Sequence, residues 1–302
     1  MYTTTRRTFF MGIAGAASAL SGEQRRVQVA GEWCFVKFPR GTPNGQVVLT
    51  LHGAGEWVNE TTSSWEQQPG ATRLMEALLE AGFAVAQSNS AARHGNGMWG
   101  NRETQSTTAA FVAWLRDRYS FRTAHAVAVS AGNLILTNLL LRGRVMFDAA
   151  VMLAPCLSLE SEYRCPGGVN RVKTIAEAYG FTRSSCPGDP QYDQEFLDKT
   201  EPDDPLRTVL AMDDASIRNA FGKTRWMAVY ESGDPRVPPG ENLRPFAARL
   251  NRAGITAHVS VMQANTHGSQ ELFLNYVPEI VAFVRARSPQ PDRSQGLRPH
   301  RV

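Results

Sequence analysis

The sequence lacks most of the features that mark metal-binding or membrane proteins. Its 302 residues include only four cysteines, and neither a C-x-x-C nor an H-E-x-x-H motif occurs, so no metal site is expected. No segment offers the roughly 20 apolar residues that a membrane-spanning helix needs. With 42% hydrophobic and 20% charged residues, the composition is typical of a soluble globular chain with one large α/β domain or two small ones.

A basic surface for nucleic acid is also missing. The formal charge of +4 comes from the two ends of the chain, namely Arg6, Arg7 and the segment 288–302, and the part between them is near neutral. No stretch of basic residues is interleaved with aromatic ones, which argues against nucleic acid as a partner. The polar segment 288–302 is expected to be a disordered tail.

The first 22 residues have the order of parts found in an export signal. Arg6-Arg7 is followed by Phe9-Phe10, a Gly/Ala-rich apolar run and the small residues Ala17-Ser18-Ala19. This segment resembles a bacterial twin-arginine signal, which implies a secreted or periplasmic protein without a stable membrane anchor. The alternative is an unprocessed N-terminus with an arginine pair that arose by chance.

The cysteines fit an oxidising compartment. The four residues allow three pairings. We favour Cys165 with Cys186, because both lie in one Pro/Gly-rich segment that a disulfide would tie down. Free buried thiols, including Cys34 and Cys156, are the alternative.

Strand and helix patterns alternate along most of the chain. Short apolar runs are separated by amphipathic segments, which predicts a mostly parallel sheet covered by helices on both faces. One domain is expected over 23–287, with a cap-like insertion over 155–223 where the pattern loosens. The predicted strands are 33–38, 46–51, 83–88, 125–130, 148–155, a segment at 225–234 and 257–262; the predicted helices are 72–82, 104–119, 133–143, 170–180, 204–211, 241–254 and 269–287, the last kinked or divided at Pro278.

Ser130 lies between a predicted strand and a predicted helix in the stretch AVAVSAGN. A serine that projects from such a sharp turn needs small residues two before and two after it, so that strand and helix can pass closely. Ala128 and Gly132 meet this need, although the usual motif has glycine at the first position. The alternative is that Ser130 only starts the helix.

Two further polar residues follow predicted strands in the order expected for partners of such a serine. Asp234 comes after the strand at 225, and His267 comes after the strand 257–262. Carboxyl ends of parallel strands share one edge of a sheet, so the three residues are expected to converge. Asp213 and Asp214 are rival acids, but they lie in a helical, charged stretch.

A glycine-rich loop follows the strand 46–51. His52-Gly53-Ala54-Gly55 would place backbone N–H groups of Ala54 and Gly55 at the same edge of the sheet. The N–H of Ala131, next after Ser130, would be one donor and that of Ala54 the other, with Gly55 as an alternative third. Two preorganised N–H donors are what acyl transfer requires for a developing oxyanion.

From about Val47 to the last helix, the chain resembles the α/β-hydrolase family. The resemblance is carried by the elbow around Ser130, by GDPRVP around Asp234, by NTHG around His267 and by HGAG at 52–55. It implies an α/β-hydrolase fold with Ser130 as nucleophile, His267 as base and Asp234 as acid. It further implies an oxyanion hole from Ala54, Ala131 and Gly55.

The segment GNGMWG matches the dinucleotide pattern G-x-G-x-x-G at Gly95, Gly97 and Gly100. A dinucleotide fingerprint follows its strand at once and opens directly into a helix, and this segment does neither. No cofactor is therefore expected. We expect the loop to line a substrate cleft, with Trp99 as an apolar wall and Asn101 as a polar contact; core packing is the alternative for Trp99.

Together these features predict an exported serine hydrolase that acts on carboxylic esters, so a small-molecule or ester substrate is the expected partner. A peptidase, lipase or thioesterase on the same fold is the nearest alternative, because one triad serves all of these reactions. A binding protein that has lost catalysis on this scaffold is an alternative from a different class.

Overall fold

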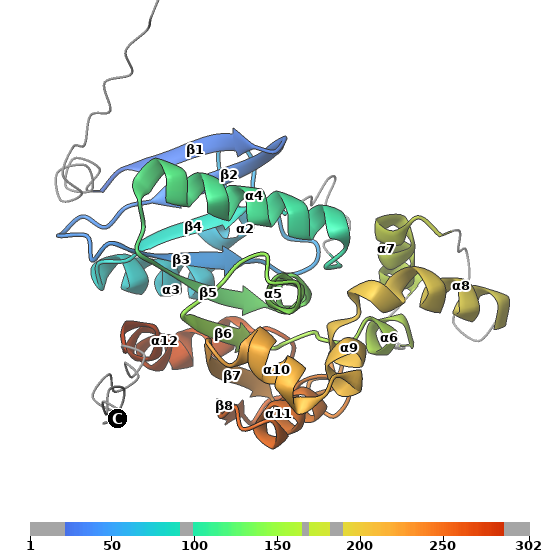
Figure 1. The fold of residues 1–302 in the computed structure, drawn as a ribbon. Coiled ribbons are helices and arrows are strands. Elements are labelled where there is room, and N and C mark those ends of the chain that lie inside the picture. The colour runs from blue at the N-terminus through green and yellow to red at the C-terminus, as the bar shows by residue number, and fades with distance from the viewer. Residues whose placement is uncertain (1–21, 91–98, 165–168, 182–189, 287–302) are drawn as a thin grey trace, which may run out of the picture.

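The computed structural model describes residues 22–90, 99–164, 169–181 and 190–286. One sheet of eight strands runs through the molecule in the order β1-β2-β4-β3-β5-β6-β7-β8 (Figure 1). β1 and β2 are antiparallel, β2 and β4 are antiparallel, and all other neighbouring pairs are parallel. The strands are β1 (Gln24–Val29), β2 (Glu32–Lys37), β3 (Gln46–Leu51), β4 (Ala84–Ser88), β5 (Thr123–Val129), β6 (Ala149–Leu153), β7 (Arg225–Glu231) and β8 (Ala257–Met262).

The sheet lies between two layers of helices because its central strands are apolar on both faces. In β5, Ala126 and Ala128 face one hydrophobic cluster, while Val127 and Val129 face the other. Alternate side chains of a strand point to opposite faces, so a strand buried on both sides reads as a continuous apolar run. This explains why the sequence predicts these strands so directly.

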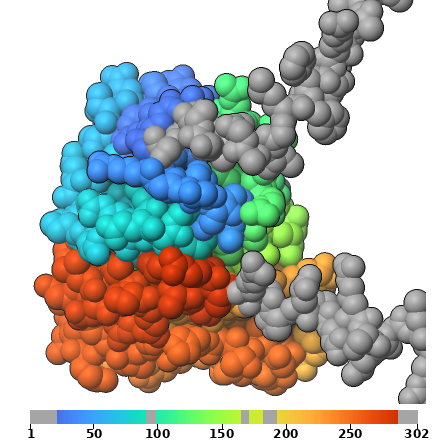
Figure 2. All heavy atoms as spheres, turned by 90° about the vertical axis from the view of Figure 1, so that its left-hand side faces the viewer, coloured from blue at the N-terminus to red at the C-terminus, as the bar shows by residue number. Residues whose placement is uncertain are grey.

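The helices divide between the two faces of the sheet. α3 and α12 cover one face, and Figure 2 shows the red C-terminal segment against blue and teal N-terminal ones. The opposite face carries helices from the middle and C-terminal parts of the chain (Figure 1). Outside the segment between β6 and β7, the helices of the two layers are α2 (Ser64–Gln67), α3 (Pro69–Glu80), α4 (Arg102–Tyr119), α5 (Gly132–Leu141), α11 (Leu243–Arg252) and α12 (Gln270–Arg285).

Of the two alternatives predicted at Pro278, a kink or a division of the helix, the structure contradicts the division. The proline lies inside one helix that runs from Gln270 to Arg285, so the helix is not divided. Ser269 caps its start by accepting a hydrogen bond from the backbone N–H of Leu272. β1 was not predicted, because its sequence QRRVQV is largely polar and only partly buried at the edge of the sheet.

The described part of the segment between β6 and β7 contains five α-helices and a short 3-10 helix. The predicted helices at 170–180 and 204–211 are present, and three further α-helices occur. The elements are α6 (Leu159–Arg164), α7 (Val169–Tyr179), α8 (Pro190–Thr200), a short 3-10 helix η2 (Glu201–Asp203), α9 (Pro205–Ala211) and α10 (Asp214–Phe221).

The first helices of this insertion share a hydrophobic cluster with the start of α5. Tyr163 and Phe196 stack with ring centroids 4.0 Å apart. Their cluster also contains Ala131 and Leu134 from the start of α5. The insertion is therefore packed directly over the end of β5 and is continuous with the body of the domain.

The turn from β5 into α5 requires a glycine at position 132. A Cβ atom there would lie 2.3 Å from the carbonyl oxygen of Leu51 and 2.7 Å from that of His52. Position 128, by contrast, does not require glycine. Ala128 is a fully buried residue of β5, paired with Leu51 and Met152, and its methyl group is accommodated there. The usual motif is thus kept at the position where the backbones approach most closely.

We expect Gly132→Ala to lower the free energy of unfolding by about 3 kcal/mol, because the added methyl group must displace main-chain atoms of β3. Gly240→Ala is the control, since a Cβ atom at that position meets nothing within 4 Å. Urea denaturation of the two variants measures the difference. Equal stability of both variants would contradict the close approach.

Candidate functional site

Ser130 occupies a strained turn at the carboxyl end of β5. Its φ of 49° lies in the left-handed region, which costs a non-glycine residue about 1–3 kcal/mol. The conformation is held by hydrogen bonds on both sides of the residue. The Ser130 N–H donates to Leu153 O at 3.0 Å, and the Ser130 carbonyl accepts from Cys156 N at 3.2 Å and from Asn133 Nδ2 at 3.0 Å.

The structure brings Ser130, His267 and Asp234 into one hydrogen-bonded series. Ser130 Oγ lies 2.8 Å from His267 Nε2, and His267 Nδ1 lies 2.6 Å from Asp234 Oδ2. The carboxylate is almost fully buried, whereas a tenth of the imidazole remains exposed. The three side chains come from loops after β5, β8 and β7, as the strand-edge argument predicts.

Asp234 is oriented by its own loop. Its second oxygen, Oδ1, accepts hydrogen bonds from the backbone N–H groups of Arg236 at 2.8 Å and Val237 at 2.9 Å. Oδ2 is thereby left for His267. The rival acids lie elsewhere, since Asp213 caps the start of α10 and Asp214 pairs with Arg249.

The loop after β3 forms a tight turn beside Ser130. The Glu56 N–H donates to Gly53 O at 3.2 Å, and Gly55 in the third position has a φ of 79°. A turn of this kind needs glycine at that position. A Cβ atom on Gly53 would lie 3.3 Å from Ser130 Cβ, so the turn is in direct contact with the serine.

The N–H groups predicted as oxyanion donors are free to bind a ligand. Within the described residues, no acceptor lies in hydrogen-bond range of the N–H groups of Ala54, Gly55 or Ala131. Ala131 is buried at the start of α5, whereas Ala54 and Gly55 are exposed. His52 is fully buried, and burial lowers the pKa of its imidazole, so this side chain is neutral near pH 7.

Glu56 holds this turn and was not singled out from the sequence. Its Oε2 accepts hydrogen bonds from the Gly53 N–H and, at 3.3 Å, from Trp65 Nε1. Its Oε1 accepts from Gln68 Nε2 at 2.6 Å, and Gln68 Oε1 in turn accepts from Gln270 Nε2 at 3.3 Å. The turn after β3 is thus connected to the start of α12, three residues beyond His267.

Trp99 and Asn101 both contact α7 of the insertion. The Trp99 side chain is buried and donates to Thr174 Oγ1 at 3.0 Å. Asn101 caps α4 by accepting from the Thr104 N–H, and its amide donates to Ala178 O at 2.7 Å. Both residues connect α7 to the rest of the domain. For Trp99, this agrees with core packing, the alternative to a role in a substrate cleft.

Two of the four cysteines lie within the described residues. Cys34 and Cys156 are free and buried, and burial raises the pKa of both thiols. Cys165 and Cys186 lie outside the described residues, as do Gly95 and Gly97. Among the described residues, no group of His, Cys, Asp or Glu side chains could hold a metal ion, and no helix is long and apolar enough to cross a membrane.

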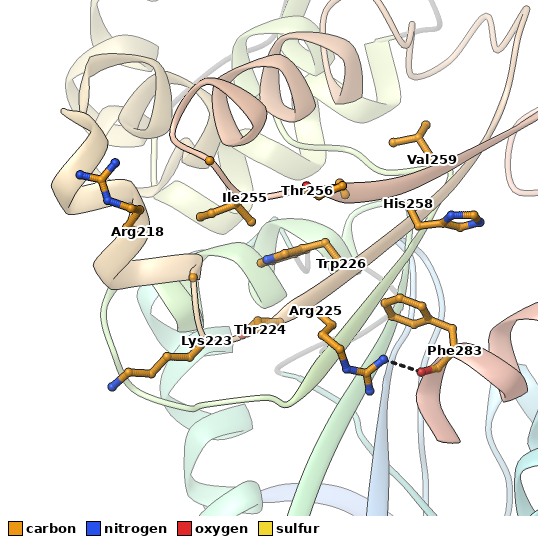
Figure 3. A pocket seen from close by; sticks show the side chains of 13 residues that line it. Arg218, Lys223, Thr224, Arg225, Trp226, Ile255, Thr256, His258, Val259 and Phe283 are labelled. Carbon is orange, nitrogen blue, oxygen red and sulfur yellow. Dashed lines mark hydrogen bonds between the residues drawn. The ribbon is translucent and has the colours of Figure 1, made fainter. Parts of the chain in front are cut away.

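A cavity of about 720 Å³ lies away from Ser130, near the amino ends of β7 and β8. Arg218, Lys223 and Arg225 line it, but Figure 3 shows their charged ends pointing in different directions. The Arg225 guanidinium already donates to the backbone carbonyls of Phe283 and Ala286. This cavity lacks a convergent set of polar groups, so the candidate site is the one at Ser130.

Neither a protein-family model nor a curated protein matches the sequence. Solved structures do match. An acylaminoacyl peptidase bound to a chloromethyl ketone aligns with a TM-score of 0.64 and 14% identity over 88% of this chain, which spans 41% of that protein.

Two esterases align over most of their own length. An esterase of the bacterial hormone-sensitive lipase family aligns with a TM-score of 0.60 and 17% identity over 87% of this chain and 84% of its own. Carboxyl esterase 2 from the fungus Tuber melanosporum aligns with a TM-score of 0.57 and 16% identity over 86% of this chain and 82% of its own. Together with the sheet order, these similarities show that the chain has the α/β-hydrolase fold.

Glu162 is a buried acid of the insertion, close to the site. Burial raises its pKa to about 7, and the charge of Asp234 acts in the same direction, while Arg171 opposes the shift. Arg171 contacts Glu162 and also donates to Arg236 O at 2.8 Å. Since the pKa is raised on folding, the stabilising contribution of this group is complete below pH 4.5 and is lost as the pH rises to about 7.

We therefore expect Glu162→Gln to change stability in a pH-dependent way. Relative to the parent protein, the variant should gain roughly 3 kcal/mol in free energy of unfolding between pH 4.5 and pH 8. Urea denaturation at both pH values gives this difference. Glu160→Gln on the same helix is the control, and an equally constant difference for both variants would contradict the prediction.

Proposed function

We propose that the protein is a serine hydrolase that cleaves carboxylic esters. The observation that carries this proposal is the series Ser130–His267–Asp234, with contacts of 2.8 and 2.6 Å. A hydroxyl is a weak nucleophile until an adjacent base removes its proton, and that base needs a third group to fix its orientation. All three parts are present here, in the order typical of the α/β-hydrolase fold.

The first half-reaction forms an acyl-enzyme. Ser130 Oγ attacks the ester carbonyl while its proton passes to His267 Nε2. Asp234 accepts the hydrogen bond from the N–H at His267 Nδ1. This keeps the lone pair that accepts the proton on Nε2, and it stabilises the imidazolium that forms. His267 then donates the proton to the leaving alcohol as the tetrahedral intermediate collapses.

The developing oxyanion is bound by backbone N–H groups of Ala54 and Ala131, with Gly55 as a further donor. This assignment is supported by the contact between Gly53 and Ser130 and by the absence of other acceptors for these N–H groups in the described chain. Fixed donors of this kind contribute about 2.7–4 kcal/mol each in comparable sites. In the second half-reaction, His267 activates water, which attacks the acyl carbon and releases Ser130.

Esters are preferred over peptides as the substrate class because of the comparisons. The esterase neighbours align over 82–84% of their own length, whereas this chain spans 41% of the first peptidase. Trp99 and the insertion residue Tyr163 belong to one buried cluster with Ala131 and Leu134 at the start of α5, which favours small or medium acyl groups. An aminoacyl peptidase on the same triad is the second candidate.

We expect the protein to hydrolyse p-nitrophenyl esters of short acids faster than aminoacyl p-nitroanilides. Ser130→Ala should lower kcat on the esters by about 10⁴-fold or more, because the nucleophile is lost. A fluorophosphonate probe should label the parent protein and leave this variant unlabelled.

Ser216→Ala is the matched control, because Ser216 lies in α10, away from the site. Equal labelling of the parent protein and Ser130→Ala would exclude Ser130 as the nucleophile. Faster cleavage of nitroanilides than of any ester would instead favour the peptidase. A folded protein without turnover of either substrate would favour the binding-protein alternative.

We further propose export through the twin-arginine signal over residues 1–22, on the strength of its sequence alone. In a bacterial host, Arg6→Lys with Arg7→Lys should retain the protein in the cytoplasm, and the exported parent should lack about the first 22 residues. Fractionation with intact-mass measurement tests both expectations. Unchanged export of the double variant would refute this signal type.

A further inference from the structure

A fully buried carboxylate, Glu231, lies at the end of β7 beneath the loop that carries His267. Its side chain has no exposed surface. An ionised group in such a place is costly unless several donors satisfy it. The contacts of Glu231 are therefore informative about why the residue is there.

Within the described residues, the donors to the Glu231 side chain come from the chain on either side of His267. Oε1 accepts from Thr266 Oγ1 at 2.8 Å and from the Ser269 N–H at 3.1 Å. Oε2 accepts from the Gly268 N–H at 2.7 Å. One carboxylate thus binds the residue before His267 and the two residues after it.

The main chain of Glu231 fixes the other partner of the imidazole. Its carbonyl accepts a hydrogen bond from the Asp234 N–H at 3.2 Å. Because Glu231 is the last residue of β7, its position is set by the sheet. A single rigid residue therefore holds both ends of the His267–Asp234 contact.

We propose that Glu231 is a positioning residue that holds His267 in line with Ser130. This inference rests on the proposed function, in which His267 exchanges a proton with Ser130 Oγ. The carboxylate matters because it offers acceptors on two oxygens to three donors. An amide at the same position has one acceptor oxygen, so at least one backbone N–H would face an NH₂ group and lose its partner.

The experiment compares Glu231→Gln with the parent protein on p-nitrophenyl acetate, with active sites counted by fluorophosphonate titration. We expect kcat per titrated site to fall about 10- to 100-fold, with KM changed less than about twofold, because a small displacement of a catalytic base affects the transition state most. The proton on His267 Nδ1 should also change its NMR chemical shift.

Glu279→Gln is the matched control. It makes the same chemical change on α12, where Glu279 accepts hydrogen bonds from His258 and Ser260. This variant should keep kcat within about twofold of the parent. Thr266→Val removes one of the three donors and should lower kcat by about 2- to 10-fold, which provides a second readout if Glu231→Gln does not fold.

The proposal is overturned if folded Glu231→Gln has the parent kcat per titrated site. A lower number of titrated sites with an unchanged kcat would mean that Glu231 contributes to stability alone. If only Thr266→Val folds, a parent-like kcat for that variant overturns it. Failure of the proposed function is a separate result, seen as equal fluorophosphonate labelling of the parent protein and Ser130→Ala.

Discussion

The close passage of α5 over the end of β3 is the constraint on which the site depends. Gly132 lies against the carbonyls of Leu51 and His52, so the turn from β5 into α5 has no freedom to relax. Ser130 consequently has a strained backbone, held by Leu153 and its neighbours in the adjacent loop. The strain is compensated by the sheet, and it projects a hydroxyl above the edge where the partner loops end.

Three carboxylates, of Asp234, Glu56 and Glu231, hold the loops around that hydroxyl. Asp234 is fixed by N–H groups of its own loop and binds His267. Glu56 closes the turn that begins at Gly53, and Glu231 binds the chain on both sides of His267. Each of these side chains accepts hydrogen bonds from several donors, because a polar group that is removed from water without partners is costly. The loops are thus anchored to strands and helices that the hydrophobic core already fixes.

The insertion contributes to the same arrangement from above. Its aromatic cluster packs on the start of α5, and Arg171 bridges Glu162 and the main chain of Arg236, two residues beyond Asp234. The insertion is therefore part of the support for the acid loop. Trp99 belongs to this packing, so a residue that looks like a cleft wall in the sequence instead connects insertion and body.

The sequence alone determined the α/β architecture and the three side chains of the series, because apolar runs of strand length mark the strands, and Ser130, Asp234 and His267 each lie in a short motif after one of them. Tertiary structure decided the rest. The edge strand β1 has too polar a sequence to be recognised, and Asn101 proved to be a helix cap. The contacts of Glu231 join residues about 35 positions apart, so no local pattern specifies them; they exist only because parallel strands end at one edge of the sheet.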